Sequence, residues 1–197
     1  MPGNPSLVLA SSSPRRLALL RQIGVEPDEI VAPEIDETPL PRELPRAHAN
    51  RLAIAKTEAA AAQPRAAACL IIGADTVVAC GRRILPKAAD AESALRCLRL
   101  LSGRRHRVYT AVAMRAPDGR QVLRVAMTMV RFKRLAADEL QRYLASGEWQ
   151  GKAGGYAIQG RAEGFTVAIN GSYSNVVGLP LAVTVDLLRG LGWRFTS

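Results

Sequence analysis

The stretch Leu7-Val8-Leu9-Ala10-Ser11-Ser12-Ser13-Pro14-Arg15-Arg16 predicts how the fold begins. Its four apolar residues are typical of a strand, and the three serines that follow mark a tight loop. Ser13 suits an N-cap and Pro14 suits the first helical position, because the N–H that proline lacks would have no partner there. Apolar residues at helical spacing then continue to a stop at Gly24. The sequence therefore predicts a strand, a tight loop and a helix.

The start of this predicted helix has features that attract an anion. Unpaired backbone N–H groups and the helix dipole favour negative charge there, and Arg15 and Arg16 add guanidiniums that can hold a phosphate through two hydrogen bonds each. The same residues also fit ordinary helix capping with surface arginines. A phosphate-binding corner and a plain cap both remain open, although the sequence G-x-x-x-x-G-K-[ST] of a Walker loop occurs nowhere in the chain.

Composition limits the class of protein. A chain of 197 residues that is 48% hydrophobic can bury a substantial core, and we expect one domain over residues 1–197, made of two lobes without a separable linker. Three cysteines without a C-x-x-C pair favour a reducing compartment, and no run of eighteen apolar residues occurs, so we expect a cytoplasmic protein with no membrane partner.

The formal net charge of +10 raises the question of nucleic acid. The arginines are spread along the whole chain, however, and aromatic residues make up only 5% of it, so platforms for stacking bases are scarce. We therefore expect no specific nucleic-acid partner.

An acid stands in the most apolar stretch, residues 67–79, which we expect to be a buried strand interrupted by Gly73-Ala74-Asp75-Thr76. An ionised carboxylate among apolar residues needs a cation, hydrogen bonds or a place at the end of a sheet, and we therefore favour a functional role for Asp75. A turn at residues 80–83 and a returning arm, Ile84 to Lys87, predict a hairpin that brings Lys87 back towards Asp75. An exposed lysine at a strand end is the alternative.

The remaining chain alternates between helical and strand patterns. We expect helices over residues 46–63, 90–101, 137–145 and 180–191, and strands over residues 107–114, 121–132 and 166–169. On spacing alone, Lys56 would face solvent from the middle of its helix. His48 and His106 have no neighbouring Cys or His that would form a zinc site, and we expect neither to be catalytic.

Two predicted loops carry polar groups. Residues 26–45 include Glu34, Asp36 and Glu37, which could hold a divalent cation, although a solvated acidic loop is commoner. Residues 151–160 contain four glycines, so their backbone must approach something closely unless they form a plain linker. Tyr156 and Gln159 in this loop offer a ring and an amide that could stack on a nucleobase and hydrogen-bond its edge.

Four landmarks in this order resemble the Maf family of nucleoside triphosphate pyrophosphatases over nearly the full length. They are Ser11 to Arg16, Gly73 to Thr76, Ile84 to Lys87, and Gly155 to Gly160 followed by Asn170-Gly171-Ser172-Tyr173 and Val177 to Pro180. The resemblance implies a two-lobed α/β fold of the Maf/ITPase type, with a mixed central sheet flanked by helices and a cleft between the lobes. It also implies a cytoplasmic enzyme, often dimeric, that uses Mg²⁺ or Mn²⁺ to cleave a nucleoside triphosphate to monophosphate and pyrophosphate.

The resemblance assigns roles to particular residues. Asp75 matches the family's proton acceptor. Arg15, Thr76 and Gln159 match the positions that separate subfamilies, and this set looks like the dTTP/UTP type. The other matching pocket residues are Ser11, Arg16, Glu37, Lys56 and Lys87. The implied catalytic residues are Asp75, Lys56 and Lys87, the implied metal ligands are Asp75 and Glu37, and the implied substrate-binding residues are Ser11, Arg15, Arg16, Thr76 and Gln159.

One departure from the family pattern is Ala88, where the family usually has proline after the lysine. Two other functions stay open at this point. One is a basic interaction protein that acts in cell division or on nucleic acid and keeps only a vestigial pocket. The other is a pyrophosphatase for modified or non-pyrimidine nucleotides.

Overall fold

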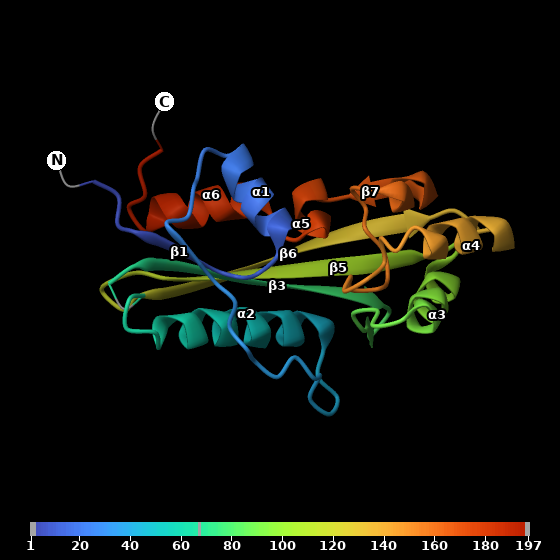
Figure 1. Cartoon of the computed structure of the whole chain (residues 1–197), viewed down its shortest axis with the longest axis horizontal. Helices are drawn as coiled ribbons and strands as arrows, with labels where there is room; N and C mark the ends of the chain where they lie inside the picture. The colour runs from blue at the N-terminus through green and yellow to red at the C-terminus, as the bar shows by residue number, and fades with distance from the viewer. Residues whose placement is uncertain (1–2, 67, 196–197) are drawn as a thin grey trace.

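A seven-stranded mixed sheet forms the centre of the protein in a computed structural model, which describes residues 3–66 and 68–195 (Figure 1). β1 pairs in parallel with β2 and with β3, and all other pairs are antiparallel. Across the sheet the strands are β2 (Glu29–Val31), β1 (Leu7–Ala10), β3 (Leu70–Cys80), β5 (Arg105–Arg115), β6 (Gln121–Phe132) and β7 (Thr166–Asn170), with β4 (Arg83–Leu85) paired to β3.

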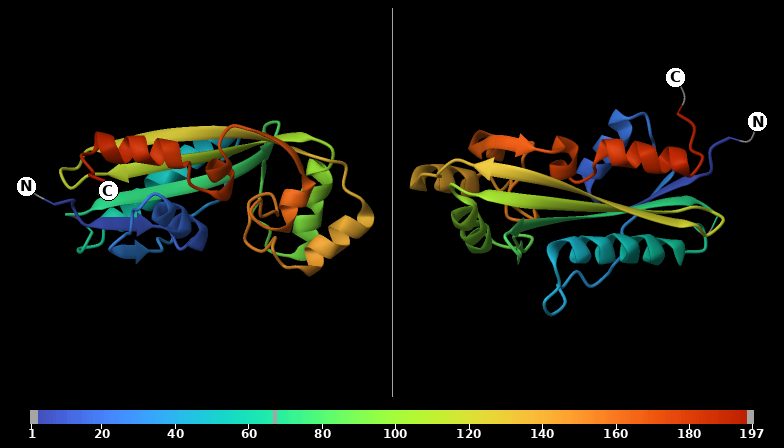
Figure 2. Two further views of the ribbon diagram at one scale, coloured as in Figure 1. Left: turned by 90° about the horizontal axis from the view of Figure 1, so that it is seen from above. Right: turned by 180° about the vertical axis from the view of Figure 1, so that it is seen from behind.

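Helices cover both faces of this sheet. α2 (Pro45–Ala61) packs on one face, and α1 (Pro14–Gln22), α5 (Tyr173–Val177) and α6 (Leu181–Gly190) lie on the other (Figure 1). α3 (Ala91–Leu101), α4 (Ala137–Ala145) and the 3₁₀ helix η1 (Arg161–Phe165) gather at the far end of the long strands (Figure 2). The predicted two-lobed α/β architecture with a mixed sheet is therefore confirmed.

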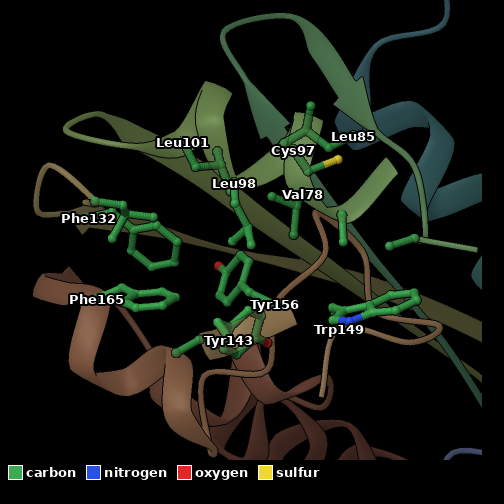
Figure 3. Close-up of a cluster of buried hydrophobic side chains, with 14 of the residues drawn as sticks. Val78, Leu85, Cys97, Leu98, Leu101, Phe132, Tyr143, Trp149, Tyr156 and Phe165 are labelled. Carbon is green, nitrogen blue, oxygen red and sulfur yellow. The ribbon is translucent and has the colours of Figure 1, made fainter. Parts of the chain in front are cut away.

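Each lobe has its own buried cluster of apolar side chains. The cluster under α3 and α4 contains the aromatic side chains of Phe132, Tyr143, Tyr156 and Phe165, which pack together among aliphatic residues (Figure 3). Aliphatic residues fill the space between β1, β3, β5 and the helices α1 and α6. The long strands β3 and β5 contribute to both clusters, so they join the lobes and fix the space between them.

Contact between α2 and β3 depends on Gly73. A Cβ at this position would lie 2.2 Å from Thr57 Oγ1 and 2.7 Å from the Ala53 carbonyl oxygen, so no larger residue fits without moving the helix. β3 continues through Gly73 without a break, and the predicted interruption at residues 73–76 is therefore wrong. Ala67, where we expected the strand to begin, lies outside the described residues.

Most other predicted elements are present, and α4 has the predicted bounds. β2 was not predicted, because residues 26–45 were expected to form a loop. Its three residues form a strand because they pair with Val8, Leu9 and Ala10 of β1. α5 was also not predicted. It has five residues, Tyr173–Val177, and Ser172 is its N-cap, whose side chain accepts a hydrogen bond from the Asn175 N–H. No helix among the described residues combines the length and the apolar character needed to cross a membrane.

Candidate active site

A cleft of about 380 Å³ lies between the lobes, a volume within the range of small-molecule sites. One side is formed by the loop after β1, the start of α1 and α2, and the other by residues 150–159. The cleft brings together all nine residues to which the family resemblance assigns a role: Ser11, Arg15, Arg16, Glu37, Lys56, Asp75, Thr76, Lys87 and Gln159.

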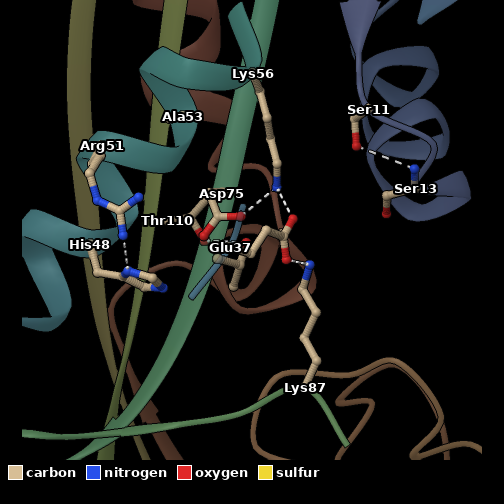
Figure 4. Close-up of polar contacts among 12 residues, drawn as sticks. Ser11, Ser13, Glu37, His48, Arg51, Ala53, Lys56, Asp75, Lys87 and Thr110 are labelled. Carbon is tan, nitrogen blue, oxygen red and sulfur yellow. Dashed lines mark hydrogen bonds and ion pairs between the residues drawn. The ribbon is translucent and has the colours of Figure 1, made fainter. Parts of the chain in front are cut away.

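Lys56 joins two carboxylates in this cleft (Figure 4). Its Nζ lies 2.6 Å from Asp75 Oδ1 and 2.8 Å from Glu37 Oε1, and Lys87 forms a further ion pair with Glu37. Lys56 is only 6% exposed and Asp75 only 2%. The expectation of a solvent-facing Lys56 is therefore wrong. Lys87 does return towards Asp75, but its ion-pair partner is Glu37.

Glu37 is ionised at neutral pH. Burial acts to raise the pKa of its carboxyl group, but the hydrogen bonds from Lys56 and Lys87 outweigh burial and lower the pKa to about 2. The two acids that were considered with it as cation ligands do not join the cleft: Asp36 accepts a hydrogen bond from the Thr38 N–H, and Glu34 is exposed.

The two carboxylates that share Lys56 also fit a divalent cation. Carboxylate oxygens are the ligands that Mg²⁺ and Mn²⁺ prefer, and Mg²⁺ is usually held by one or two carboxylates together with substrate phosphates and water. Within residues 3–66 and 68–195, no group of three or more His, Cys, Asp or Glu side chains could hold a metal by itself. The protein thus offers a partial coordination shell that a phosphate ligand would complete.

Arg16 lies beneath the cleft and is 9% exposed. Its Nε donates to the Gly178 carbonyl at 3.0 Å, Nη1 to Ser11 Oγ at 2.9 Å, and Nη2 to Thr76 Oγ1 at 3.3 Å. Ser11 Oγ also accepts a hydrogen bond from the Ser13 N–H. The protein's own acceptors therefore already bind the Arg16 guanidinium and the Ser13 N–H at this helix start. Ser13 occupies the N-cap position, but its side chain forms no capping hydrogen bond.

Arg15 differs from its neighbour. It lines the cleft half-buried, burial lowers the pKa of its guanidinium, and its side chain forms no hydrogen bond or ion pair with any other described residue. It is therefore the guanidinium at this helix start that remains open to an anion. Lys152, which the sequence did not single out, lines the same cleft; its position in a glycine-rich loop was the available signal.

The loop of residues 151–160 contributes Gln159 to the cleft, and Gln159 is exposed. Tyr156 also borders the cleft, but nearly all of its surface is buried in the core. It is 5% exposed, its hydroxyl hydrogen-bonds His106 Nε2 at 2.8 Å, and its ring packs edge-on against His106 and Phe132. The expected use of this ring as a stacking platform is therefore wrong. His106 takes part in core packing, with its ring edge-on to Phe132 and Tyr156.

Alternation along β3 separates the two neighbouring polar residues of the cleft. Asp75 faces α2 and bonds Lys56, whereas Thr76 faces Arg16 and the Thr110 hydroxyl on the other side of the sheet. Sequence reasoning did not identify Thr110, because threonine is common in strands.

Comparison with known proteins identifies the family. The family described as Maf-like protein matches residues 6–191. The chain belongs to the Maf family. This Maf chain is 57% identical to the dTTP/UTP pyrophosphatase of Rhodopseudomonas palustris (strain HaA2), over 98% of the chain and 95% of that protein. It is also 57% identical to the dTTP/UTP pyrophosphatase of Caulobacter vibrioides, over 98% of the chain and 100% of that protein.

A solved structure has a weaker likeness to this Maf chain. The nucleoside-triphosphatase, or dITP/XTP pyrophosphatase, of Mycobacterium abscessus aligns with a TM-score of 0.44 and 18% identity, covering 67% of this chain and 76% of that chain.

Proposed function

We propose that this Maf protein hydrolyses dTTP and UTP to the monophosphate and pyrophosphate, and that residues 1–197 act as one catalytic domain. The observation that carries the proposal is the pair of carboxylates, Asp75 and Glu37, held by Lys56 in a cleft with excess positive charge. Five cationic side chains and these two carboxylates line the cleft: Arg15, Arg16, Lys56, Lys87 and Lys152, with Asp75 and Glu37. The excess of three positive charges suits a triphosphate. Two relatives that are dTTP/UTP pyrophosphatases support thymine and uracil as the nucleobases of the substrates.

The reaction needs a water molecule to attack the α-phosphorus while the bond to the bridging oxygen of pyrophosphate breaks. We assign Asp75 to accept the proton of that water, because Lys56 orients its carboxylate at 2.6 Å. Lys56 and Lys87 balance the negative charge of the phosphates, and in particular the charge that develops on the departing pyrophosphate. Ser11, Arg15 and Arg16 form the phosphate side of the site, while Gln159 and Thr76 lie where a pyrimidine edge would be recognised.

A divalent cation, Mg²⁺ or Mn²⁺, would be held by Asp75 and Glu37. When bound, it supplies positive charge at the phosphate oxygens and lowers the energy of the anionic transition state. Lys56 contacts one oxygen of each carboxylate, so a cation held there would compete with its ammonium for them. The phosphates of the substrate then offer its ammonium new acceptors.

The test is a nucleotide panel with Mg²⁺. Purified protein is incubated with dTTP, UTP, dATP and GTP, and with 5-methyluridine and pseudouridine triphosphates, and pyrophosphate and monophosphate are quantified. We expect equal amounts of both products from dTTP and UTP. Absence of pyrophosphate from every nucleotide would favour the basic interaction protein, and preference for a modified or purine nucleotide would overturn the assigned substrates.

Asp75→Asn tests the assigned base. We expect turnover to fall below detection while a non-hydrolysable triphosphate analogue still binds, because the cationic groups remain. Asp138→Asn is the matched control, since this exposed carboxylate pairs with Arg142 on the surface of α4 and its loss should leave turnover unchanged. Wild-type turnover in the Asp75 variant would refute the assignment. The cytoplasmic location and the homodimer implied by the resemblance stay predictions.

A further inference from the structure

We propose that Thr110 and Asn175 fix the hydroxyl of Thr76 as a hydrogen-bond acceptor, and that this acceptor selects uracil and thymine over cytosine. The inference rests on the proposed function, because it assigns base selection within the same cleft. Thr110 and Asn175 touch no predicted catalytic group, so both are positioning residues.

A continuous row of hydrogen bonds links the cleft to α5. Arg16 Nη2 donates to Thr76 Oγ1 at 3.3 Å, the hydroxyls of Thr76 and Thr110 lie 3.0 Å apart, and Thr110 Oγ1 lies 2.8 Å from the Asn175 carbonyl oxygen. Thr110 and Asn175 are fully buried, whereas Thr76 is half-buried and lines the cleft. Water therefore has no access to the inner part of the row.

The two ends of the row determine the direction of every hydrogen bond. A guanidinium can only donate and a carbonyl oxygen can only accept, whereas each threonine hydroxyl has one hydrogen. Thr110 must donate to the Asn175 carbonyl, because otherwise the lone pairs of two oxygens would face each other at 2.8 Å. Thr110 is then the acceptor for Thr76. The hydroxyl hydrogen of Thr76 is thereby committed, and towards the cleft Thr76 offers only a lone pair.

Three further hydrogen bonds hold Asn175, and with it the backbone carbonyl that accepts from Thr110, in place. Asn175 Nδ2 donates to the Val108 carbonyl at 3.1 Å and to Thr128 Oγ1 at 2.9 Å, and the Asn175 N–H donates to Ser172 Oγ at 3.2 Å. These bonds connect α5 to both β5 and β6, so the carbonyl cannot turn away from Thr110 without disrupting them. The direction of the row is a property of the packed fold.

This direction has a consequence for base recognition. Uracil and thymine carry an N–H at ring position 3, which can donate to an acceptor, whereas cytosine has a bare nitrogen with a lone pair at that position. At ring position 3, a fixed acceptor therefore complements the N–H of uracil or thymine and repels the lone pair of cytosine. A hydroxyl that could rotate would donate to cytosine instead and would lose most of this discrimination.

Thr110→Val tests the inference, because valine keeps the shape of threonine and removes the hydroxyl that accepts from Thr76. The measurement is kcat/KM for UTP and for CTP. We expect the wild type to prefer UTP by at least about tenfold, and the Thr110 variant to lose about tenfold of that ratio, mainly through faster CTP hydrolysis. Thr110→Ser restores a hydroxyl and should restore the ratio.

Thr184→Val is the matched control, since this threonine is also fully buried and donates to a carbonyl, that of Pro180, at 2.9 Å. A purely structural role for Thr110 would lower both rates together, and an unchanged UTP to CTP ratio would overturn the inference. If Thr110→Val does not fold, Thr76→Val serves instead: loss of the acceptor must lower kcat/KM for UTP more than for CTP. Failure of the wild type to hydrolyse any pyrimidine triphosphate would refute the proposed function itself, and pyrimidine hydrolysis without UTP preference would refute only this inference.

Discussion

Replacing Lys56 by methionine probes the charge arrangement of the cleft. The ammonium contacts Asp75 Oδ1 at 2.6 Å and Glu37 Oε1 at 2.8 Å, and the Lys56 side chain is 8% exposed. Methionine fills much of the same volume without the charge. Glu37 keeps its ion pair with Lys87, but Asp75 has no other ion pair in the described parts of the chain. A carboxylate that is almost fully buried is then left without its counter-ion.

The expected loss can be worked out from this environment. Removing one partner of a buried ion pair costs about 3–5 kcal/mol, and we take the lower end because Glu37 is partly exposed and stays paired. For a chain of this length, a loss of about 3 kcal/mol lowers Tm by about 6–12 °C. A divalent cation can replace the missing positive charge, and at ten times its Kd it restores about 1.4 kcal/mol, or about 3–6 °C.

The assay is thermal unfolding in EDTA and then in increasing MnCl₂, combined with counting of free Mn²⁺ by electron paramagnetic resonance. We expect the nucleotide-free wild type to bind Mn²⁺ weakly, because Lys56 occupies both carboxylates, and the variant to bind it more tightly. Lys133→Met is the matched control, since it removes a lysine from a surface pair with Glu139 and should change Tm far less than Lys56→Met does. Equal Mn²⁺ affinity in the wild type and the Lys56 variant would refute the reasoning.

Two further predictions concern stability. Burial lowers the pKa of His106 to about 4, so between pH 6.5 and 4 the unfolded chain takes up a proton that the folded chain does not, and the wild type should lose roughly 2–3 kcal/mol as the pH falls from 7.5 to 4.5. His106→Phe should remove this part of the loss in urea unfolding at the two pH values, and an unchanged pH dependence would contradict the assignment. Gly73→Ala should destabilise the protein by about 3 kcal/mol, because the added Cβ would lie 2.2 Å from Thr57 Oγ1. Gly164→Ala, whose Cβ would meet nothing within 4 Å, is its control in the same urea experiment, and equal midpoints for the two variants would contradict the proposed close packing of α2 on β3.

Local patterns were sufficient for the elements that carry their own signals. α3 has Asp90 as its N-cap and an apolar face, and α4 has the predicted bounds, because caps and helical periodicity are properties of neighbouring residues. Asp75 was also identified from sequence, since an acid within an apolar strand stands out against its neighbours. These features need no knowledge of distant contacts.

Other features depend on contacts that the sequence does not display. Lys56 lies in an alanine-rich helix whose small residues occur on every side, so periodicity could not show that it faces the sheet. β2 owes its order to pairing with β1, and its three residues have no strand pattern of their own. Thr110 gains its partner only when α5 packs against β5, a contact between residues 65 positions apart. Tertiary packing decides all three cases.

The alternating side chains of β3 place Asp75 and Thr76 on opposite faces of the sheet, although the two residues are consecutive. If Thr76 and Thr110 select the base as proposed, substitutions on the α5 face would change which nucleotide is preferred while Lys56 keeps its contacts with Asp75 and Glu37. Directed evolution could use this separation, by varying Thr76 and Thr110 in a library while every member retains Lys56, Asp75 and Glu37.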